Sequence, residues 1–297
     1  VLDSCKNLER KGFDVTYVKV NENGIVALED IARAINENTI LVSVMYANNE
    51  IGTVQPVLEI AKLCKEKKVL FHTDATQAVG KLPIDLSDHN IDMLSFSSHK
   101  MYGPKGVGAL YKSGKLPRIR VTPQTDGGAQ EKGLRAGTLN VPGIVGFGTA
   151  CEIAHNLLET ESNRILQLKN RLYSGIISGV KGVKVNGDMS KRIPGNLNIS
   201  IPGIDADSLM MAMKDIAVST GSACSSESVE PSHVLSAIGL DKKLMRSTIR
   251  FGIGRFNTEE EIDFVINKVT EKVNYLLSID TPSGNGSKTK KGEYAEN

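Results

Sequence analysis

The order in which strand-like and helix-like segments follow one another constrains the fold of this chain more than any other feature. Apolar extended stretches alternate with amphipathic ones, so the sequence predicts strands at 14–20, 40–46, 69–73, 91–96 and 106–111, and helices at 1–11, 28–35 and 57–67. Such alternation is typical of a mostly parallel sheet with helices on both faces. Ligands of these sheets bind beyond the carboxyl ends of the strands. We therefore expect the polar residues that follow the strands to share one crevice.

The second half of the chain has a different pattern. It begins with a long helical stretch at 142–180, with one or more breaks, after which we expect strands at 184–185, 196–201, 216–219 and 247–253, and helices at 206–214, 231–238 and 258–277. Thr258 is expected to cap the last helix in a capping box with Glu261. We therefore divide the chain into an α/β domain at 1–158, a smaller α+β domain at 159–279 and a polar tail at 280–297 that we expect to be disordered.

The composition is that of an ordinary globular protein. Of 297 residues 40% are hydrophobic and the net charge is +2, so neither a nucleic acid nor a membrane partner is indicated. The scattered cysteines lack the close pairing of a zinc site or a disulfide framework, which suits a reducing compartment. We expect the first three, unlike the fourth, to be small buried hydrophobes; the four are Cys5, Cys64, Cys151 and Cys224.

The segment after the predicted strand at 91–96 presents a lysine in a chemically useful position. Lys100 follows three small or polar residues and precedes a turn set by Gly103 and Pro104. A lysine at the end of a buried strand can be partly desolvated, which lowers its pKa and frees the amine for a Schiff base. For a lysine alone, a solvated surface position is the simpler interpretation. Asp74 ends an earlier strand, however, and an acid and a lysine on two strand ends are the pair that a pyridoxal phosphate enzyme needs.

Four short motifs resemble, in this order and spacing, those of the NifS/IscS-type cysteine desulfurases, a group of class-V aminotransferases that use pyridoxal 5′-phosphate. They are NNEIG at 48–52, HTDATQ at 72–77, SSHKMYGPKG at 97–106 and GSAC at 221–224. The combination is highly specific, and the resemblance runs from Val1 to about residue 278. It implies a fold-type I enzyme that converts L-cysteine to L-alanine and keeps the sulfur as an enzyme-bound persulfide.

The resemblance also implies roles around the cofactor ring. Lys100 bonds the aldehyde, Asp74 pairs with the ring nitrogen, and Gln77 donates a hydrogen bond to the phenolic oxygen. Asn49 holds the substrate carboxylate or the ring oxygen. Without the resemblance, Asp74 is a helix cap or loop acid, Gln77 a helix-surface residue and Asn49 part of a turn.

Phosphate binding is expected from three polar side chains. Ser97 and His99 resemble the phosphate ligands of the family, and Thr138 would reach the same phosphate from the neighbouring subunit, so the site depends on a homodimer. His99 is alternatively a structural histidine, and Thr138 alternatively belongs to a plain turn. His72 is expected to point to the face opposite Thr73 and receives no role.

Two further residues would act on the substrate. Cys224 lies in a long segment of small and polar residues, where a thiol is exposed and available as a nucleophile. The resemblance implies that it takes the sulfur and carries it to an acceptor, touching an iron–sulfur cluster or an acceptor-bound metal only transiently; no other metal site is expected. Arg250 would bind the substrate carboxylate through a two-bond geometry that lysine cannot reproduce, and a surface ion pair is its alternative role.

Some elements of the family are not in this chain. A phosphate loop and a histidine that stacks on the ring lie upstream of the position equivalent to Val1, so we expect an N-terminally truncated enzyme. On this interpretation the 297 residues hold the cofactor weakly or not at all and are inactive by themselves. The polar tail at 280–297 also differs from the longer tail with which the family engages a scaffold protein.

The resemblance implies L-cysteine as substrate and, as partner, an iron–sulfur scaffold protein or another sulfur acceptor such as a tRNA thiolation pathway, with no direct contact to nucleic acid or membrane. The compartment is the mitochondrial matrix in a eukaryote and the cytoplasm in a bacterium. Two alternatives stay open: another class-V enzyme, such as a selenocysteine lyase or an aminotransferase, and a catalytically dead interaction subunit. Cys224 favours the desulfurase, because an aminotransferase needs no such thiol.

Overall fold

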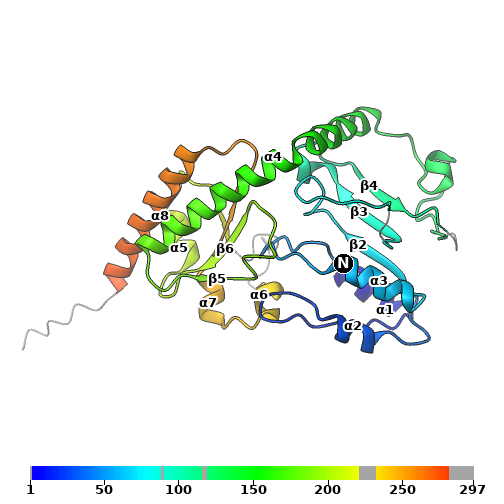
Figure 1. Cartoon of the computed structure of the whole chain (residues 1–297), viewed down its shortest axis with the longest axis horizontal. Coiled ribbons are helices and arrows are strands. Elements are labelled where there is room, and N and C mark those ends of the chain that lie inside the picture. Colours follow the sequence, from blue (N-terminus) through cyan, green and yellow to red (C-terminus); the bar gives the residue numbers. More distant parts are fainter. Residues whose placement is uncertain (1, 88–89, 116–118, 221–231, 281–297) are drawn as a thin grey trace, which may run out of the picture.

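Two β-sheets, each with its own hydrophobic core, make up the protein. The computed structural model describes residues 2–87, 90–115, 119–220 and 232–280. One long helix, α4 (Val141–Gly179), runs from the first sheet to the second (Figure 1).

The first sheet is mostly parallel. Its strands, in spatial order, are β1 (Leu41–Ser43), β2 (Leu70–Asp74), β3 (Met93–Ser97) and β4 (Gly108–Lys112). The first three are parallel, whereas β4 is antiparallel to β3 because the connection between them is too short for a crossover. The helices of this part are α1 (Leu2–Arg10), α2 (Leu28–Ala34), α3 (Val57–Glu66) and the short 3₁₀ helices η1 (Ser98–Met101) and η2 (Gln130–Gly133). Where α3 packs on β2, Ile60, Cys64 and Phe71 are fully buried.

The second sheet is entirely antiparallel. Its strands, in spatial order, are β5 (Lys184–Val185), β6 (Asn196–Ser200), β8 (Thr248–Gly252) and β7 (Ser219–Thr220). The helices of this part are α5 (Ala206–Ala212), α6 (His233–Ala237), α7 (Lys242–Arg246) and α8 (Glu259–Asp280). Leu197 and Ile249 of the sheet share a core with Ile176 of α4 and Val269 of α8, and all four are fully buried. The capping box of α8 is confirmed, because Thr258 and Glu261 exchange backbone-to-side-chain hydrogen bonds of 3.2 and 3.3 Å.

Helix α4 is continuous, so the expected breaks were wrong. Its glycines serve close packing instead: a Cβ at Gly146 would lie 2.7 Å from the ring of Pro104, and one at Gly175 would lie 2.5 Å from Ile266 of α8. The predicted boundary at residue 158 falls inside this helix. The division into two domains therefore stays a prediction.

Three other expectations differ from the structure. Residues 14–20 form no strand and contribute only an isolated bridge between Val20 and Val26, because no neighbouring strand in the described part pairs with them. Helix α7 was missed, since its five residues are too few for a periodic pattern. Of the cysteines, Cys64 is fully buried, but Cys5 and Cys151 are half-exposed.

No helix in the described ranges has both the length and the apolar character to cross a membrane, and no cluster of three or more His, Cys, Asp or Glu side chains within these ranges could hold a metal.

Candidate active site

Asp74 and Ser97 end two neighbouring parallel strands. Asp74 is the last residue of β2 and pairs in register with Ser95 of β3, two residues before Ser97. One carboxylate oxygen of Asp74, Oδ1, accepts the backbone N–H of Thr76 at 3.0 Å. The other oxygen has no hydrogen-bond partner among the described residues, so it can accept a hydrogen bond from a protonated ring nitrogen. The two strand ends are therefore neighbours in the sheet, and the gathering of Asn49, Asp74 and Lys100 in one crevice at such ends stays a prediction.

Lys100 lies on η1, directly after β3. Because a 3₁₀ helix has three residues per turn, Ser98 and Met101 share one face, and both are buried. His99 and Lys100 consequently point outward and are exposed. The expectation that burial desolvates Lys100 was wrong for the described chain. The buried residues on either side fix its backbone instead.

A second lysine, which the sequence analysis missed, lies beside Lys100. Lys81 is half-buried, and its burial, together with the charge of Lys100, lowers its pKa to about 8. Its Nζ lies 3.0 Å from Oε1 of Gln77, four residues earlier in the chain. An ammonium group can only donate, so Oε1 of Gln77 must face Lys81 and Nε2 must point away from it. This amide N–H₂ is thus free to donate to a phenolic oxygen. The four-residue spacing of Gln77 and Lys81 was the available signal.

The two residues predicted to bind the substrate carboxylate meet each other. Nη1 of Arg250 on β8 donates to the backbone oxygen of Asn49 at 2.9 Å, and its Nε donates to Oγ of Ser219 at 3.1 Å. The side-chain amides of Asn196 and Asn198 both donate to the backbone oxygen of Glu50 at 3.1 Å. The loop after β1 is therefore held against the second sheet, and Asn49 and Arg250 come together although they are 201 positions apart.

Glu50 is a buried acid within this contact. Its carboxylate accepts a hydrogen bond from Oγ of Ser232, the N-cap residue of α6. Burial raises the pKa of Glu50, while Ser232, His233 and Arg250 act in the opposite direction. Sequence reasoning missed Glu50 because a glutamate beside a turn is ordinarily solvated.

His72 lies on the sheet face opposite Thr73, as predicted. Its ring nitrogens lie 2.8 Å from Oγ of Ser43 and 3.1 Å from Oγ of Ser95, so one imidazole joins three parallel strands. Burial lowers the pKa of His72, although the nearby Asp74 opposes this shift. The ring is accordingly favoured in its neutral form next to Asp74.

The remaining predicted site residues, Thr138 and Cys224, are not joined to the others by any contact that the structure describes. Thr138 is exposed on the segment before α4, and no hydrogen bond in the described part joins it to Lys100 or Ser97. Cys224 lies outside the described residues. Two surface hollows, one between α4 and α8 and one between α2 and α3, include none of the predicted site residues.

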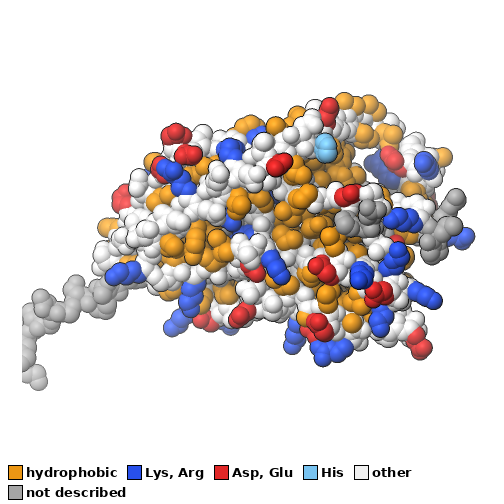
Figure 2. Space-filling model, viewed as in Figure 1, with side chains coloured by type: hydrophobic (Ala, Val, Ile, Leu, Met, Phe, Trp, Pro, Cys, Tyr) orange, Lys and Arg blue, Asp and Glu red, His pale blue; other side chains and the backbone are white. Residues whose placement is uncertain are grey.

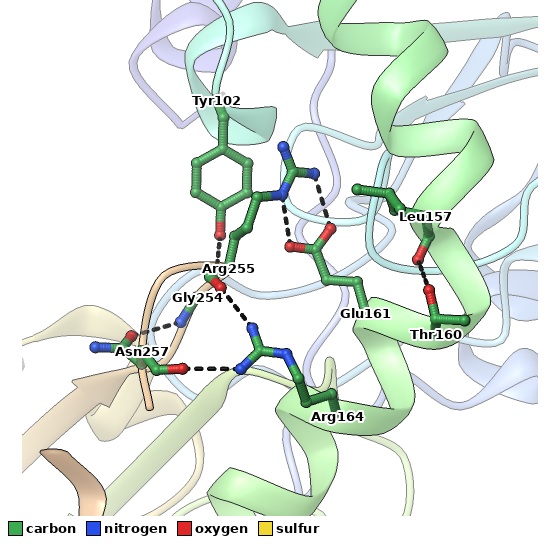
Figure 3. A network of polar contacts seen from close by, with 8 residues as sticks. All are labelled: Tyr102, Leu157, Thr160, Glu161, Arg164, Gly254, Arg255 and Asn257. Carbon is green, nitrogen blue, oxygen red and sulfur yellow. Dashed lines mark hydrogen bonds and ion pairs between the residues drawn. The ribbon is translucent and has the colours of Figure 1, made fainter. Parts of the chain in front are cut away.

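A polar network links the end of η1 to the turn that follows β8 (Figure 3). The hydroxyl of Tyr102 accepts the backbone N–H of Arg255 at 2.7 Å. The guanidinium of Arg255 in turn makes two hydrogen bonds of 2.7 and 2.8 Å to the carboxylate of Glu161 on α4. Nothing in the sequence pairs these residues, because Tyr102 and Arg255 are 153 positions apart.

The donor set around η1 fits pyridoxal phosphate. It offers a carboxylate oxygen for the ring nitrogen, an amide N–H₂ for the phenolic oxygen and an exposed amine for the aldehyde, from Asp74, Gln77 and Lys100. Ser97 and His99, immediately before the lysine, add a hydroxyl and an imidazole for a phosphate. Each group has the chemistry that its ligand atom requires.

Comparison with known proteins gives concordant results. The aminotransferase class-V family model matches residues 2–265. A cysteine desulfurase IscS from Rickettsia bellii is 50% identical over 279 residues, which cover 94% of this chain and 68% of the relative. A mitochondrial cysteine desulfurase from the fungus Arthroderma benhamiae is 51% identical, with the chain spanning 55% of its length. The solved structure of a NifS-like protein superposes with a TM-score of 0.84 at 39% identity, covering 93% of this chain and 72% of that one.

Proposed function

Because the chain belongs to the cysteine desulfurases of the class-V aminotransferase family, we propose that it takes the sulfur atom of L-cysteine onto Cys224 and releases L-alanine. The observation that supports this proposal is the contact of Arg250 with Asn49, which joins a guanidinium from the second sheet to the loop that follows β1 of the first. A guanidinium binds a carboxylate with two parallel hydrogen bonds.

Each residue has a defined task in the proposed reaction. Pyridoxal phosphate, when bound at Lys100, supplies an electron sink that makes the bonds to the substrate Cα and Cβ labile. Asp74 holds the proton on the ring nitrogen, and Gln77 donates to the phenolic oxygen. Ser97 and His99 bind the phosphate together with Thr138 of a second subunit. The amine of Lys100 moves protons to and from the substrate carbons.

The sulfur transfer balances without a further reagent. The thiolate of Cys224 attacks the substrate sulfur, so an S–S bond forms and the Cβ–S bond of the substrate breaks. The electron pair stays on Cβ, which takes up a proton to become the methyl group of alanine. Cys224 is left as a persulfide, from which an iron–sulfur scaffold protein or a tRNA thiolation protein would draw sulfur. The relatives include bacterial enzymes and a mitochondrial one, and this chemistry suits either compartment.

An exposed apolar surface supports a homodimer. Hydrophobic side chains gather along the upper edge of the molecule, over the N-terminal half of α4 (Figure 2). Val141 and Val145 are 59% and 63% exposed there, and Ile144 is 41% exposed. This surface directly follows Thr138, the residue that would serve the site of the other subunit.

Sulfide release tests the proposal. The full-length protein, upstream residues included, is incubated with L-cysteine and a thiol reductant, which frees the persulfide sulfur as sulfide, and is compared with Cys224→Ser. We expect sulfide from the parent and at least a ~100-fold loss in the variant. Sulfide release that Cys224→Ser leaves unchanged would rule out the persulfide route. Absence of release from the parent would favour an interaction subunit, and release of selenide from selenocysteine alone would favour a lyase.

A further inference from the structure

The backbone of Tyr102 adopts a conformation that large side chains rarely take. Tyr102 ends η1 in the left-handed region, with φ at +67°, two residues after Lys100. A bulky residue persists in this region only where the surrounding structure holds it there. Whatever holds the Tyr102 side chain therefore also holds the end of the helix that carries Lys100.

The side chain of Tyr102 is held by two residues from the turn after β8. Its hydroxyl accepts the backbone N–H of Arg255 at 2.7 Å, and the guanidinium carbon of Arg255 lies 4.5 Å from the ring centroid, in cation–π distance. The ring of Phe256 meets the Tyr102 ring edge-on, with centroids 5.7 Å apart and planes at 78°. A single short segment thus contacts the tyrosine ring twice, through the guanidinium of Arg255 and the ring of Phe256.

Arg255 is itself fixed by α4. The side chains of Arg255 and Glu161 are only 19% and 11% exposed, and their two hydrogen bonds have the planar fork geometry that lysine cannot form (Figure 3). Arg164, one turn further along α4, donates to the backbone oxygens of Arg255 and Asn257. The turn at 254–257 is consequently tied to the long helix through side chains and backbone alike.

This turn begins two residues after β8, the strand that carries Arg250. Resting on the functions proposed above for Lys100 and Arg250, we propose that Arg255 is a positioning residue: held by Glu161, it fixes Tyr102 and so sets where Lys100 stands relative to Arg250. The amine that bonds the cofactor and the guanidinium that binds the substrate come from different sheets. Arg255 connects the segments that carry these two groups to the same helix, α4.

The matched variants are Arg255→Lys and Arg171→Lys. Arg171 also lies on α4 and also makes a two-bond pair, with Asp263 of α8 at 2.7 Å for both bonds, but it has no contact with η1. Each substitution keeps the positive charge and removes the fork. A general loss of stability at α4 would therefore affect both variants, whereas a loss of positioning would affect only Arg255→Lys.

The first measurement follows the visible absorbance that develops when pyridoxal phosphate is added to the cofactor-free full-length protein, upstream residues included, with Lys100→Ala as the blank. We expect Arg255→Lys to slow this rise about tenfold, since small displacements of a reacting group are costly, and Arg171→Lys to stay within about twofold of the parent. Equal rates in parent and Arg255→Lys would overturn the proposal. A parent that shows no difference from Lys100→Ala would instead overturn the proposed function.

The second measurement needs no cofactor and decides the positioning role in either case. The amide of Gly103 donates to the backbone oxygen of Ser98 at 3.1 Å and reports on the end of η1. We expect its hydrogen exchange to be about tenfold faster in Arg255→Lys than in Arg171→Lys. Tyr102→Phe, which keeps the ring but loses the hydroxyl, should give a smaller acceleration in the same amide. Exchange at the parent rate in both Arg255→Lys and Tyr102→Phe would refute the positioning role.

Discussion

The segments that follow β2 and β3 make a useful comparison. Both leave the carboxyl ends of neighbouring parallel strands, and each carries a lysine, Lys81 in the first and Lys100 in the second. Lys81 is half-buried with a pKa lowered to about 8, whereas Lys100 is exposed and fixed through buried neighbours. We expected burial to lower the pKa of Lys100, the lysine in the motif at 97–106. Burial instead lowers the pKa of Lys81, which lies outside that motif. The proposed reacting amine is thus the exposed one of the two.

The largest effect should come from removing that amine. Lys100→Ala takes away both the bond to the cofactor and the proton carrier, so kcat for sulfide release should fall by at least ~10⁴-fold. The control is Lys105→Ala, an exposed lysine in the same motif, which should retain activity within about twofold. Comparable activity in Lys100→Ala and Lys105→Ala would assign the amine function elsewhere, with Lys81 as the first candidate.

Asp74→Asn should have the next largest effect. An amide cannot keep a proton on the ring nitrogen, so we expect kcat to fall about 10²- to 10³-fold while the fold is retained. Asp92→Asn is the control. Asp92 lies just before the amino end of β3, opposite the end that carries Ser97, and its carboxylate accepts the backbone N–H of Phe71 at 2.8 Å. Asp92→Asn should lower the free energy of unfolding but leave kcat within about twofold of the parent. An equal loss of kcat in Asp74→Asn and Asp92→Asn would contradict the role proposed for Asp74.

The pH dependence of stability should separate the two lysines further. The folded protein lowers the pKa of Lys81 from 10.5 to about 8, so the unfolded chain binds more protons between these values. The free energy of unfolding should therefore rise with pH from about 8 to about 10.5, by on the order of 1–3 kcal/mol from this group. Lys81→Met should flatten that rise in urea titrations, whereas exposed Lys62→Met should not. An unchanged slope in Lys81→Met would show that Lys81 is solvated.

The smallest effect should come from the contact that anchors the first segment to α4. Oγ of Ser162 donates to the backbone oxygen of Lys81 at 2.9 Å, and Ser162→Ala should lower the free energy of unfolding by about 0.5–1.5 kcal/mol. Ser178→Ala is the matched control, since its hydroxyl bonds only within the exposed part of the same helix, at 2.8 Å to Ser174, and should cost less than about 0.5 kcal/mol. Equal costs would mean that the Lys81 backbone is held by other contacts.

Local sequence patterns predicted well the strand ends and the helix cap described above. The strands ending at Asp74 and Ser97 were placed within two residues, because an apolar run that ends in polar residues marks both burial and termination. The capping box of Thr258 and Glu261 was predicted because it needs only a four-residue window. Features that are set by residues close in sequence were therefore accessible.

Features that depend on distant residues were not. The meeting of Tyr102 with Arg255, and the burial of Glu50 against Ser232, join positions 153 and 182 residues apart. Lys100 was expected to be partly desolvated because it follows a buried strand, but the 3₁₀ turn that follows the strand rotates it outward. Exposure at such a turn depends on the phase of a three-residue period, which the sequence pattern does not reveal.

The continuity of α4 limits how the length of this protein can change. Ala154 packs with Met101 of η1, Glu161 bonds Arg255, and Ile176 lies in the core of the second sheet, so three contacts depend on the phase of one helix. Inserting a single residue between Ala154 and Glu161 would turn everything beyond it by about 100° and advance it by about 1.5 Å. A change of about seven residues, close to two full turns, restores the phase but moves the later contacts along the helix axis by about 10 Å. The three contacts therefore fix the number of residues that lie between them along α4.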